Sequence, residues 1–468
     1  MKFYGRDKEL QEINTIINRE NSDLIYLYGR RRVWKTSLVL KSLEDKKFLY
    51  FFVWEKSKQA LLNDFNEIIQ KHFNVSYLKF TSFKDLLAFL FDRVQEEKLI
   101  IVFDEFQNFC NSDKSIFSDF QYFWDLHKNT ASIKLFFLGS HFILIKKIFE
   151  ANKQPLYWRA TGSFFIKQFS LQTQVEILKD HGIYSPENLL YFYAIFWWIA
   201  KYIEIFLQNY QKEKDFKENI FDIIFRENSF FLNEAKDIFA LEFGKSYAKY
   251  FSILEAIALW NTKKNEIANY TGITTDSLWI YIQKLEKFYE LITRNTSIES
   301  KKTTTNSNYK IKDLFLNFWF KYIFKNENYR EIGDFETLKH IVKSDIIGFL
   351  WLSFETLSRE FFIQCNLRWE LPFKFDTIWN YFDKKWVNEI DLILKNTKER
   401  KIIFVECKIN TNKIDMSTLK VLKQKVENIW KYRNYEKYYA FMSLEKSAYD
   451  FSDEKVLLYS IADSAVVW

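Results

Sequence analysis

The sequence predicts an α/β fold that begins with a parallel, doubly wound sheet. Two observations support this prediction. Short apolar runs alternate with helical segments from Leu24 to Leu138, which is the order of a parallel sheet with helices on both faces. The strand pattern stops at Leu171 and returns only near the C-terminal end. Because the 468 residues correspond to about three domains as a prior, we expect several units, bounded at residues 1–168, 169–240, 241–335 and 336–468.

The composition is that of a globular protein. Hydrophobic residues make up 48% of the chain and charged residues 28%, which suffices for a large core. The net charge of +7 permits a nucleic-acid partner without requiring one. The three cysteines lie far apart and lack CxxC spacing, which argues against a disulfide framework or zinc site and indicates a reducing cytoplasm. The longest apolar run, Leu189–Ala200, is too short to span a bilayer, so we expect a buried helix and no membrane partner.

The first domain opens with a helix and a buried strand. Apolar residues recur on one stripe between Lys8 and Arg19, as in an amphipathic helix, and the run Leu24–Tyr28 indicates a strand. The segment GRRRVWKTS (residues 29–37) follows and leads into a helix that ends near Ser42. This is the strand, loop and helix order of a P-loop, G-x-x-x-x-G-K-[ST], with one deviation.

A P-loop wraps a phosphate with backbone N–H groups, while its lysine reaches the outer phosphates and its hydroxyl holds Mg²⁺. Lys35 and Thr36 stand at these two positions, but Trp34 replaces the second glycine. A glycine there lets the backbone approach phosphate without a Cβ in the way, so we expect the indole of Trp34 to fill the phosphate seat. The candidate nucleotide-binding residues are Gly29, Arg30, Arg31, Arg32, Val33, Trp34, Lys35, Thr36 and Ser37.

Two further strands supply candidate residues for hydrolysis. The strand KLIIVFDE has the form of a Walker B strand, in which Asp104 would hold Mg²⁺ and Glu105 would orient or deprotonate the attacking water. The next buried strand, IKLFFL, is followed by Ser140, which lies where a sensor group would contact the γ-phosphate. Arg159 is a candidate charge-sensing arginine, and a surface arginine is an equally good interpretation. The other elements expected in this domain are a strand at 47–53 and helices at 57–73, 82–96 and 117–129.

The middle of the chain is predicted to be helical. A lid on the first domain is expected from helices at 173–181, 185–207 and 215–228. A helix-turn-helix with a wing is then expected from helices at 251–259, 264–270 and 274–288 and a strand at 291–294. Lys284 and Lys287 on the third helix, with Lys301 and Lys302 in the wing, permit DNA contact, although winged helices also serve as packing modules.

The last domain carries a second candidate site on predicted strands at 378–382, 389–394 and 401–408. Asp391, Glu406 and Lys408 form the D…E-x-K arrangement of PD-(D/E)XK nucleases. In this arrangement two carboxylates bind a metal ion, and the lysine stabilises the attacking water or the developing charge. Glu355, on a helix expected at 346–365, can complete the metal shell. The alternative is a structural salt-bridge cluster in a nuclease-like α/β domain that cuts nothing.

The order of these motifs resembles that of a known family. YGRDKEL, YGRRRVWKTSL, IVFDEFQ, FFLGSH and PLYWRATG, then a winged helix, NEIDLIL and FVECK, resemble the archaeal-type P-loop ATPases. These are single-chain relatives of the AAA and STAND ATPases, and many carry a C-terminal restriction-endonuclease-like domain. The resemblance implies ATP binding by residues 29–37, centred on Lys35 and Thr36. It also implies roles in Mg²⁺ binding and hydrolysis for Asp104 and Glu105.

Tryptophan stands where glycine is expected. The chain has 15 tryptophans against 9 glycines, and the positions concerned are Trp34, Trp158, Trp197, Trp198, Trp260, Trp379 and Trp386. Independent drift would replace glycine with alanine, serine or aspartate at least as often as with tryptophan. The codon UGA is read as tryptophan in some genetic codes and as glycine in others, so we hypothesise that several of these residues are misread glycines. Trp124 and Trp319, on aromatic-rich helices, are expected to be genuine.

Three functions are open from the sequence. The first is an ATP-binding ATPase that acts as a nucleotide-gated switch on DNA or in host defence, with ATP and Mg²⁺ as cofactors. The second is a pseudo-ATPase that serves as a signalling or scaffold protein, which would follow if Trp34 is genuine. The third is a metal-dependent DNA nuclease that its ATPase half regulates.

Overall fold

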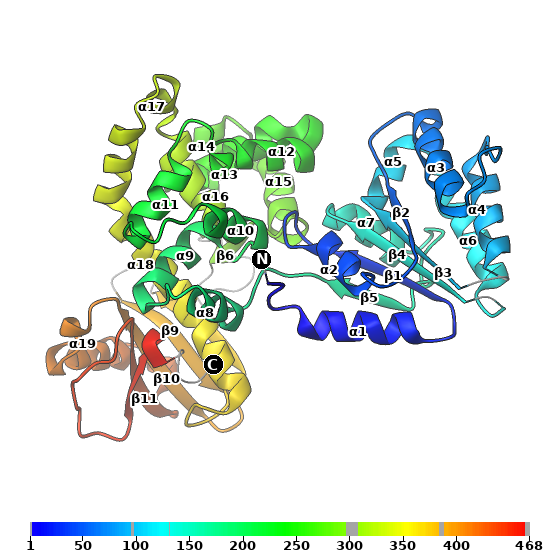
Figure 1. Ribbon diagram of the computed structural model, residues 1–468. Coiled ribbons are helices and arrows are strands. Elements are labelled where there is room, and N and C mark those ends of the chain that lie inside the picture. The colour runs from blue at the N-terminus through cyan, green and yellow to red at the C-terminus, as the bar shows by residue number, and fades with distance from the viewer. Residues whose placement is uncertain (1, 95–97, 131, 296–307, 383–387, 464–468) are drawn as a thin grey trace. The chain divides into compact units, whose positions relative to one another are not determined.

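The computed structural model describes residues 2–94, 98–130, 132–295, 308–382 and 388–463 (Figure 1). The chain divides into two compact units. The first comprises Met1–Phe169 with Ile199–Tyr202, and the second comprises Ser170–Trp198 with Ile203–Trp468. The first long stretch therefore ends next to Leu171, where the strand pattern of the sequence stops. The finer division into four domains stays a prediction.

The first unit is built on a parallel sheet, as predicted, and its five strands have the order β2-β3-β4-β1-β5 (Figure 1). The three central strands are buried along their whole length, because helices cover both faces of a parallel sheet. The sequence does not predict β5, which is only four residues long. The strands are β1 (Asp23–Tyr28), β2 (Leu49–Phe52), β3 (Leu99–Asp104), β4 (Ile133–Gly139) and β5 (Gly162–Phe165).

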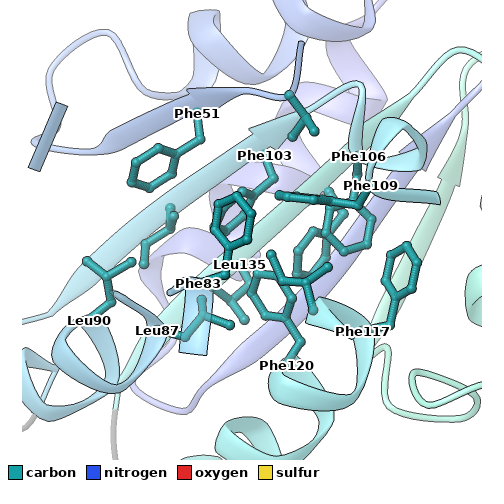
Figure 2. Packing of buried hydrophobic residues seen from close by; sticks show 14 of the residues in the cluster. Phe51, Phe83, Leu87, Leu90, Phe103, Phe106, Phe109, Phe117, Phe120 and Leu135 are labelled. Atoms are coloured by element: carbon teal, nitrogen blue, oxygen red, sulfur yellow. The ribbon is translucent and has the colours of Figure 1, made fainter. Parts of the chain in front are cut away.

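Two separate cores cover the faces of this sheet. On one face, α1 (Asp7–Asn18) and α2 (Lys35–Ser42) contribute mainly aliphatic side chains. The other face carries an aromatic core in which Phe103 contacts both Phe51 and Phe106 (Figure 2). The helical segments on this side are α3 (Lys58–Phe73), α4 (Phe83–Arg93), η1 (Phe106–Asn108), α5 (Phe109–Ser112), α6 (Ile116–His127) and α7 (Phe142–Glu150).

The helices that follow depart from the sequence prediction at one point. The single helix expected over residues 185–207 is divided into α9 (Pro186–Phe196) and α10 (Ala200–Asn209). The division falls at Trp197 and Trp198, whose φ angles of 40° and 65° are left-handed and end a right-handed helix. The other helical segments here are α8 (Leu171–Asp180), α11 (Phe216–Ile224), η2 (Phe230–Leu232), α12 (Glu234–Phe243) and η3 (Gly244–Ser246).

Three helices and a two-stranded antiparallel sheet come next, in the order expected of a winged helix. Lys284 and Lys287 lie in the last turn of the third helix. Lys301 and Lys302 lie outside the described residues. The elements are α13 (Tyr247–Ala258), α14 (Lys264–Thr271), α15 (Thr275–Lys287), β6 (Ile292–Asn295) and β7 (Asn308–Ile311), followed by α16 (Leu314–Phe318), the π-helix η4 (Trp319–Phe324) and α17 (Glu327–Glu331).

The 34-residue helix α18 (Phe335–Arg368) leads into the last sheet. The sequence predicts this helix only from residue 346, which is wrong, because the helix begins at Phe335 and buries Leu338 and Val342. The sheet has the order β12-β11-β10-β9-β8, antiparallel from β8 to β10 and parallel from β10 to β12. Its elements are β8 (Thr377–Phe382), β9 (Glu389–Asn396), β10 (Lys401–Lys408), η5 (Thr411–Lys413), α19 (Met416–Glu427), η6 (Trp430–Tyr432), β11 (Glu436–Ser443) and β12 (Val456–Ser460). Within the described ranges, no helix is both long and apolar enough to cross a membrane.

Among the residues that the structure describes, six tryptophans have a left-handed backbone, with φ between 40° and 71°: Trp34, Trp158, Trp197, Trp198, Trp260 and Trp369. A bulky side chain is rare in this region, which glycine adopts at no steric cost. Five of the six are positions where the sequence leads us to expect glycine, and Trp386 lies outside the described residues. Trp124 and Trp319, by contrast, are buried in α6 and η4.

The tryptophans also differ in their hydrogen bonding. The Nε1–H of Trp319 donates to the carbonyl of Leu232 at 3.1 Å. In the described part of the chain, the buried Nε1 atoms of Trp198 and Trp379 have no hydrogen-bond partner. A buried donor without an acceptor costs about 1–3 kcal/mol. An indole is therefore poorly accommodated at these two positions.

Candidate nucleotide-binding site

The loop between β1 and α2 holds its lysine against its own backbone. Lys35 is buried, and its Nζ donates to the carbonyls of Gly29 at 3.0 Å and Arg30 at 2.7 Å. Gly29 is required by a close approach, because a Cβ there would lie 2.2 Å from the carbonyl oxygen of Ile166. Since α2 begins at Lys35, the positive end of its dipole lies at this loop, an arrangement that binds anions.

Thr36 and Asp104 are brought together at the ends of α2 and β3. Thr36 Oγ1 donates to Asp104 Oδ2 at 2.5 Å, and the hydroxyl of Tyr50 donates to the same oxygen at 2.8 Å. Asp104 is only 3% exposed, because the strand that carries it is buried throughout. A carboxylate beside a hydroxyl supplies the oxygen ligands that Mg²⁺ prefers, so these two predicted residues fit the ion.

Glu105 lies next to this pair and is fixed by neighbouring side chains. Its Oε2 accepts a hydrogen bond from Ser140 Oγ at 2.7 Å and another from Gln107 Nε2. Burial alone would raise the pKa of Glu105, but Arg31, the Gln107 hydrogen bond and Lys35 together hold the pKa below its ordinary value. The carboxylate is therefore ionised at neutral pH, as a group that orients or deprotonates water must be.

The sequence interpretation misses Tyr50 and Gln107. Tyr50 lies within β2 and reaches Asp104 across the neighbouring strand. Gln107 packs on Gly139 at the end of β4, where a Cβ would lie 2.5 Å from its Oε1. The contact of Tyr50 with Asp104 and the packing of Gln107 on Gly139 both join residues that are distant in sequence. The only local signal is the place of Gln107, two residues after Glu105.

The predicted sensor arginine lies elsewhere. Arg159 Nε and Nη2 donate to Asp125 Oδ2 at 3.0 and 2.8 Å, and Nη1 donates to the carbonyl of Tyr157. The structure thus brings Ser140 to Glu105 and places Arg159 in an ion pair with α6. This matches the surface-arginine interpretation of the sequence.

Trp34 has a left-handed φ of 66° and immediately precedes α2. Its ring stacks on Phe3, with centroids 5.3 Å apart and planes 13° apart, and meets Phe169 edge-on at 5.4 Å. Arg6 Nη2 completes this cluster by donating to the carbonyl of Val33 at 3.3 Å. The expectation that the indole fills the phosphate seat is therefore wrong for this conformation, because the ring is directed to two aromatic side chains beside the loop.

The parallel sheet, the loop that carries Lys35 and Thr36, and the acidic pair that ends the buried strand β3 define a P-loop ATPase. Comparison with known proteins identifies the group. Residues 3–188 match an ATPase domain found predominantly in Archaea, and residues 319–426 match a family of archaeal and bacterial proteins of unknown function. The chain belongs to the archaeal-type P-loop ATPase family.

Relatives and solved structures agree with this assignment. An uncharacterized protein of Methanocaldococcus jannaschii is 31% identical over 463 residues, which cover 98% of this chain and 99% of that protein. An uncharacterized ATP-binding protein of the same organism is 22% identical over 222 residues, 40% of this chain and 65% of its own length. The Walker-type ATPase of Pyrococcus abyssi has a similar fold, with a TM-score of 0.52 at 20% identity, covering 68% of this chain and 96% of its own. The Aeropyrum pernix ORC2 protein, in ADPNP and ADP complexes, has a TM-score of 0.51 at 13% identity and covers 71% and 96%.

The second candidate site lies at the ends of β9 and β10. Val405 pairs with Leu392, so Glu406 and Asp391 are neighbours across the two strands. Asp391 Oδ2 accepts the N–H of Cys407 at 2.7 Å. Burial, and then the charge of Glu406, raises the pKa of Asp391.

The two lysines at this site both contact Glu406. Lys408 Nζ donates to Glu406 at 2.8 Å, consistent with side chains two apart on one face of a strand, and Lys425 Nζ lies at 3.1 Å. The sequence interpretation does not include Lys425, which lies on α19. Burial and then the charge of Asp391 raise the pKa of Glu355, on α18, to about 8.

The three-carboxylate metal centre expected from Glu355, Asp391 and Glu406 is not assembled in this conformation. Among the described residues, no three His, Cys, Asp or Glu side chains form a group that could hold a metal ion. The physical reason is that Glu406 forms ion pairs with Lys408 and Lys425. Asp391 accepts a hydrogen bond from the backbone N–H of Cys407. The cluster in this structure is a salt-bridge network with two buried carboxyl groups beside it.

Proposed function

We propose that this protein is an ATP-hydrolysing, nucleotide-gated switch that acts on DNA. One observation carries the proposal: Thr36 is bonded to Asp104 and Ser140 to Glu105, so four candidate groups from α2, β3 and β4 meet at one edge of the sheet. The fold similarity to the ORC2 protein supports the ATPase architecture. The link to DNA rests on the order of three helices and a hairpin in the second unit.

The chain's own residues divide the work of hydrolysis. Lys35 leaves the carbonyls of Gly29 and Arg30 to bind the outer phosphates. Thr36 and Asp104 would hold Mg²⁺, which would supply neutralisation of phosphate charge. Ionised Glu105 accepts a proton from the water that attacks the γ-phosphorus, while the bond to the β-phosphate oxygen breaks and that oxygen leaves with the electron pair. Ser140 responds to this step, because its hydroxyl donates to Glu105 Oε2 and that hydrogen bond weakens when the carboxylate becomes neutral.

Measurements of turnover and binding test this proposal. In a chain with glycine at position 34, Glu105→Gln is expected to keep ATP affinity and lose turnover, whereas Lys35→Ala loses both. Lys41→Ala is the matched control, because Lys41 lies on the same helix but pairs with Glu44 at the surface. Turnover that survives Glu105→Gln would refute the assigned role.

We infer further that glycine is the native residue at position 34 and at the other left-handed tryptophans. Each non-glycine residue in this region costs roughly 1–2 kcal/mol, so six cost about 6–12 kcal/mol, comparable to the whole stability of a domain. Trp158, Trp260 and Trp369 are in addition 84%, 64% and 74% exposed, which is unusual for tryptophan. UGG codons at these six positions, or a native peptide mass that matches tryptophan, would overturn this inference.

A second candidate function is a metal-dependent DNA nuclease in the last sheet. Its support is the juxtaposition of Asp391 and Glu406 with Lys408 beside them. Asp391 and Glu406 would hold the metal ion, which supplies an activated water. The test is cleavage of DNA in Mg²⁺ or Mn²⁺ that is abolished by Asp391→Ala. Absence of cleavage under both ions removes this candidate and leaves the ATPase proposal standing.

A further inference from the structure

The second unit contains a cavity of about 530 Å³ between the β6–β7 hairpin, α18 and the last sheet. This volume lies in the range of roughly 300–1,000 Å³ that is typical of ligand sites. The hairpin contributes Arg294 and Lys310, α18 contributes Glu355 and Arg359, and β9 contributes Leu392. The cavity thus joins the hairpin of the predicted winged helix to the helix that carries Glu355.

One face of α18 lines this cavity, and it is largely polar. Leu352, Glu355, Thr356, Arg359 and Glu360 recur at intervals of three and four residues, so they share one side of the helix. A helix face turned inward in a globular protein is ordinarily apolar. Thr356 and Glu360 are exposed to solvent, but Glu355 is buried and Arg359 is half-buried, so two charged groups of α18 lie in the inner part of the cavity.

Basic side chains outnumber acidic ones around the cavity: Arg294, Lys310, Lys312, Lys321 and Arg359 against Glu355 and Glu360. Some of the basic groups already have partners within the unit. Lys321 pairs with Asp345 at 2.7 Å, Lys312 lies 3.6 Å from Glu290, and Arg359 Nη2 donates to the Ile378 carbonyl at 2.9 Å. Lys310 is exposed and acts electrostatically on Glu355, so it is the cation best placed to meet an incoming anion.

We propose that this cavity binds the phosphate backbone of a single nucleic-acid strand, with Lys310 and Arg359 as its cations and Glu355 at its inner wall. Phosphate oxygens match an ammonium and a guanidinium placed on opposite walls. A strand is favoured over a free nucleotide because the β6–β7 hairpin, which follows the three helices of the predicted winged helix, supplies Arg294 and Lys310 to the cavity wall. The choice of a nucleic acid as the ligand rests on the second candidate function. The proposal itself requires only that the cavity binds the strand, and it does not require cleavage.

The test is fluorescence anisotropy of a labelled single-stranded oligodeoxynucleotide with the full chain, in EDTA so that no cleavage occurs. Lys310→Glu is expected to weaken binding by about tenfold or more, because a phosphate contact becomes a repulsion. Lys420→Glu is the same charge reversal at an exposed position of α19 that does not line the cavity. It is expected to leave the affinity within about twofold, because salt screens an exposed charge that does not contact the strand.

Three results would overturn the proposal. Equal losses in Lys310→Glu and Lys420→Glu would mean that binding is general electrostatic attraction. A loss confined to Lys287→Glu would place the strand on α15 instead. Full competition by deoxythymidine monophosphate at equal phosphate concentration would make the ligand a free nucleotide. Thermal unfolding of each variant separates loss of binding from loss of fold, and cleavage assays with Mg²⁺ report on the nuclease candidate separately.

Discussion

Replacing Trp34 with glycine tests both the site and the identity of residue 34. The backbone there is left-handed, with φ at 66°, so glycine relieves about 1–2 kcal/mol of strain. The change also removes the ring pair with Phe3, worth about 0.5–1.5 kcal/mol. The two effects nearly cancel, and we expect the free energy of unfolding to change by less than about 1 kcal/mol.

The effect on ATP binding is expected to be much larger. A Cβ before the lysine keeps phosphate from the backbone N–H groups at the start of α2, and hydrogen bonds to a charged group contribute about 1.5–3 kcal/mol each. The loss of two such bonds corresponds to about 3–6 kcal/mol, or at least a hundredfold in affinity. Isothermal titration with Mg–ATP should therefore detect no binding to the Trp34 chain and clear binding to Trp34→Gly.

Trp260→Gly is the matched control, because it relieves the same kind of strain, at φ 71°, in the other unit. It should leave ATP affinity unchanged. Tight ATP binding by the Trp34 chain would refute the steric reasoning. Equal affinities of the Trp34 chain and the Trp34→Gly variant would refute it as well.

Three further predictions concern single side chains. Loss of a buried tryptophan ordinarily costs about 3–5 kcal/mol. Trp198→Gly should cost less than this in urea unfolding, because it also removes a left-handed strain and a buried indole N–H that has no acceptor among the described residues; a loss of the full amount would contradict this. Glu105→Gln should lower turnover by about 10²–10⁴-fold at unchanged ATP affinity, measured by phosphate release. Asp222→Asn should lower stability by about 0.5–1 kcal/mol at neutral pH. Burial alone would raise the pKa of Asp222, but hydrogen bonds from Lys214 and Lys339 hold the pKa below its ordinary value. This stabilisation is therefore present above the unfolded-state pKa and lost as pH falls through the folded-state pKa, so the two proteins should converge in stability once the pH is below the folded-state pKa. A difference that persists there would contradict the linkage.

The pattern of apolar and polar residues predicts those elements of this fold that are determined by neighbouring residues in the sequence. The strands that carry Asp104 and Ser140 are continuous apolar runs, so their order and their polar ends could be read directly. The roles of Tyr50 and Lys425 could not be predicted, because each depends on an acidic side chain of a different element: Tyr50 of β2 contacts Asp104, and Lys425 of α19 contacts Glu406. The break between α9 and α10 was missed for a different reason, since Trp197 and Trp198 are residues that do not predict a left-handed turn, whereas a pair of glycines would.

The continuity of α18 has a mechanical consequence for the second unit. At its start Lys339 pairs with Asp222 of α11, and in its middle Phe349 packs on Phe318 of α16. Near its end Asn366 is bonded in both directions to the backbone of Phe375, just before the last sheet. A continuous helix of 34 residues, about 50 Å long, has no joint at which these two groups of contacts could separate. The helical array and the terminal sheet should therefore melt in a single cooperative transition, and a chain cut before residue 336 should leave neither part with a complete core.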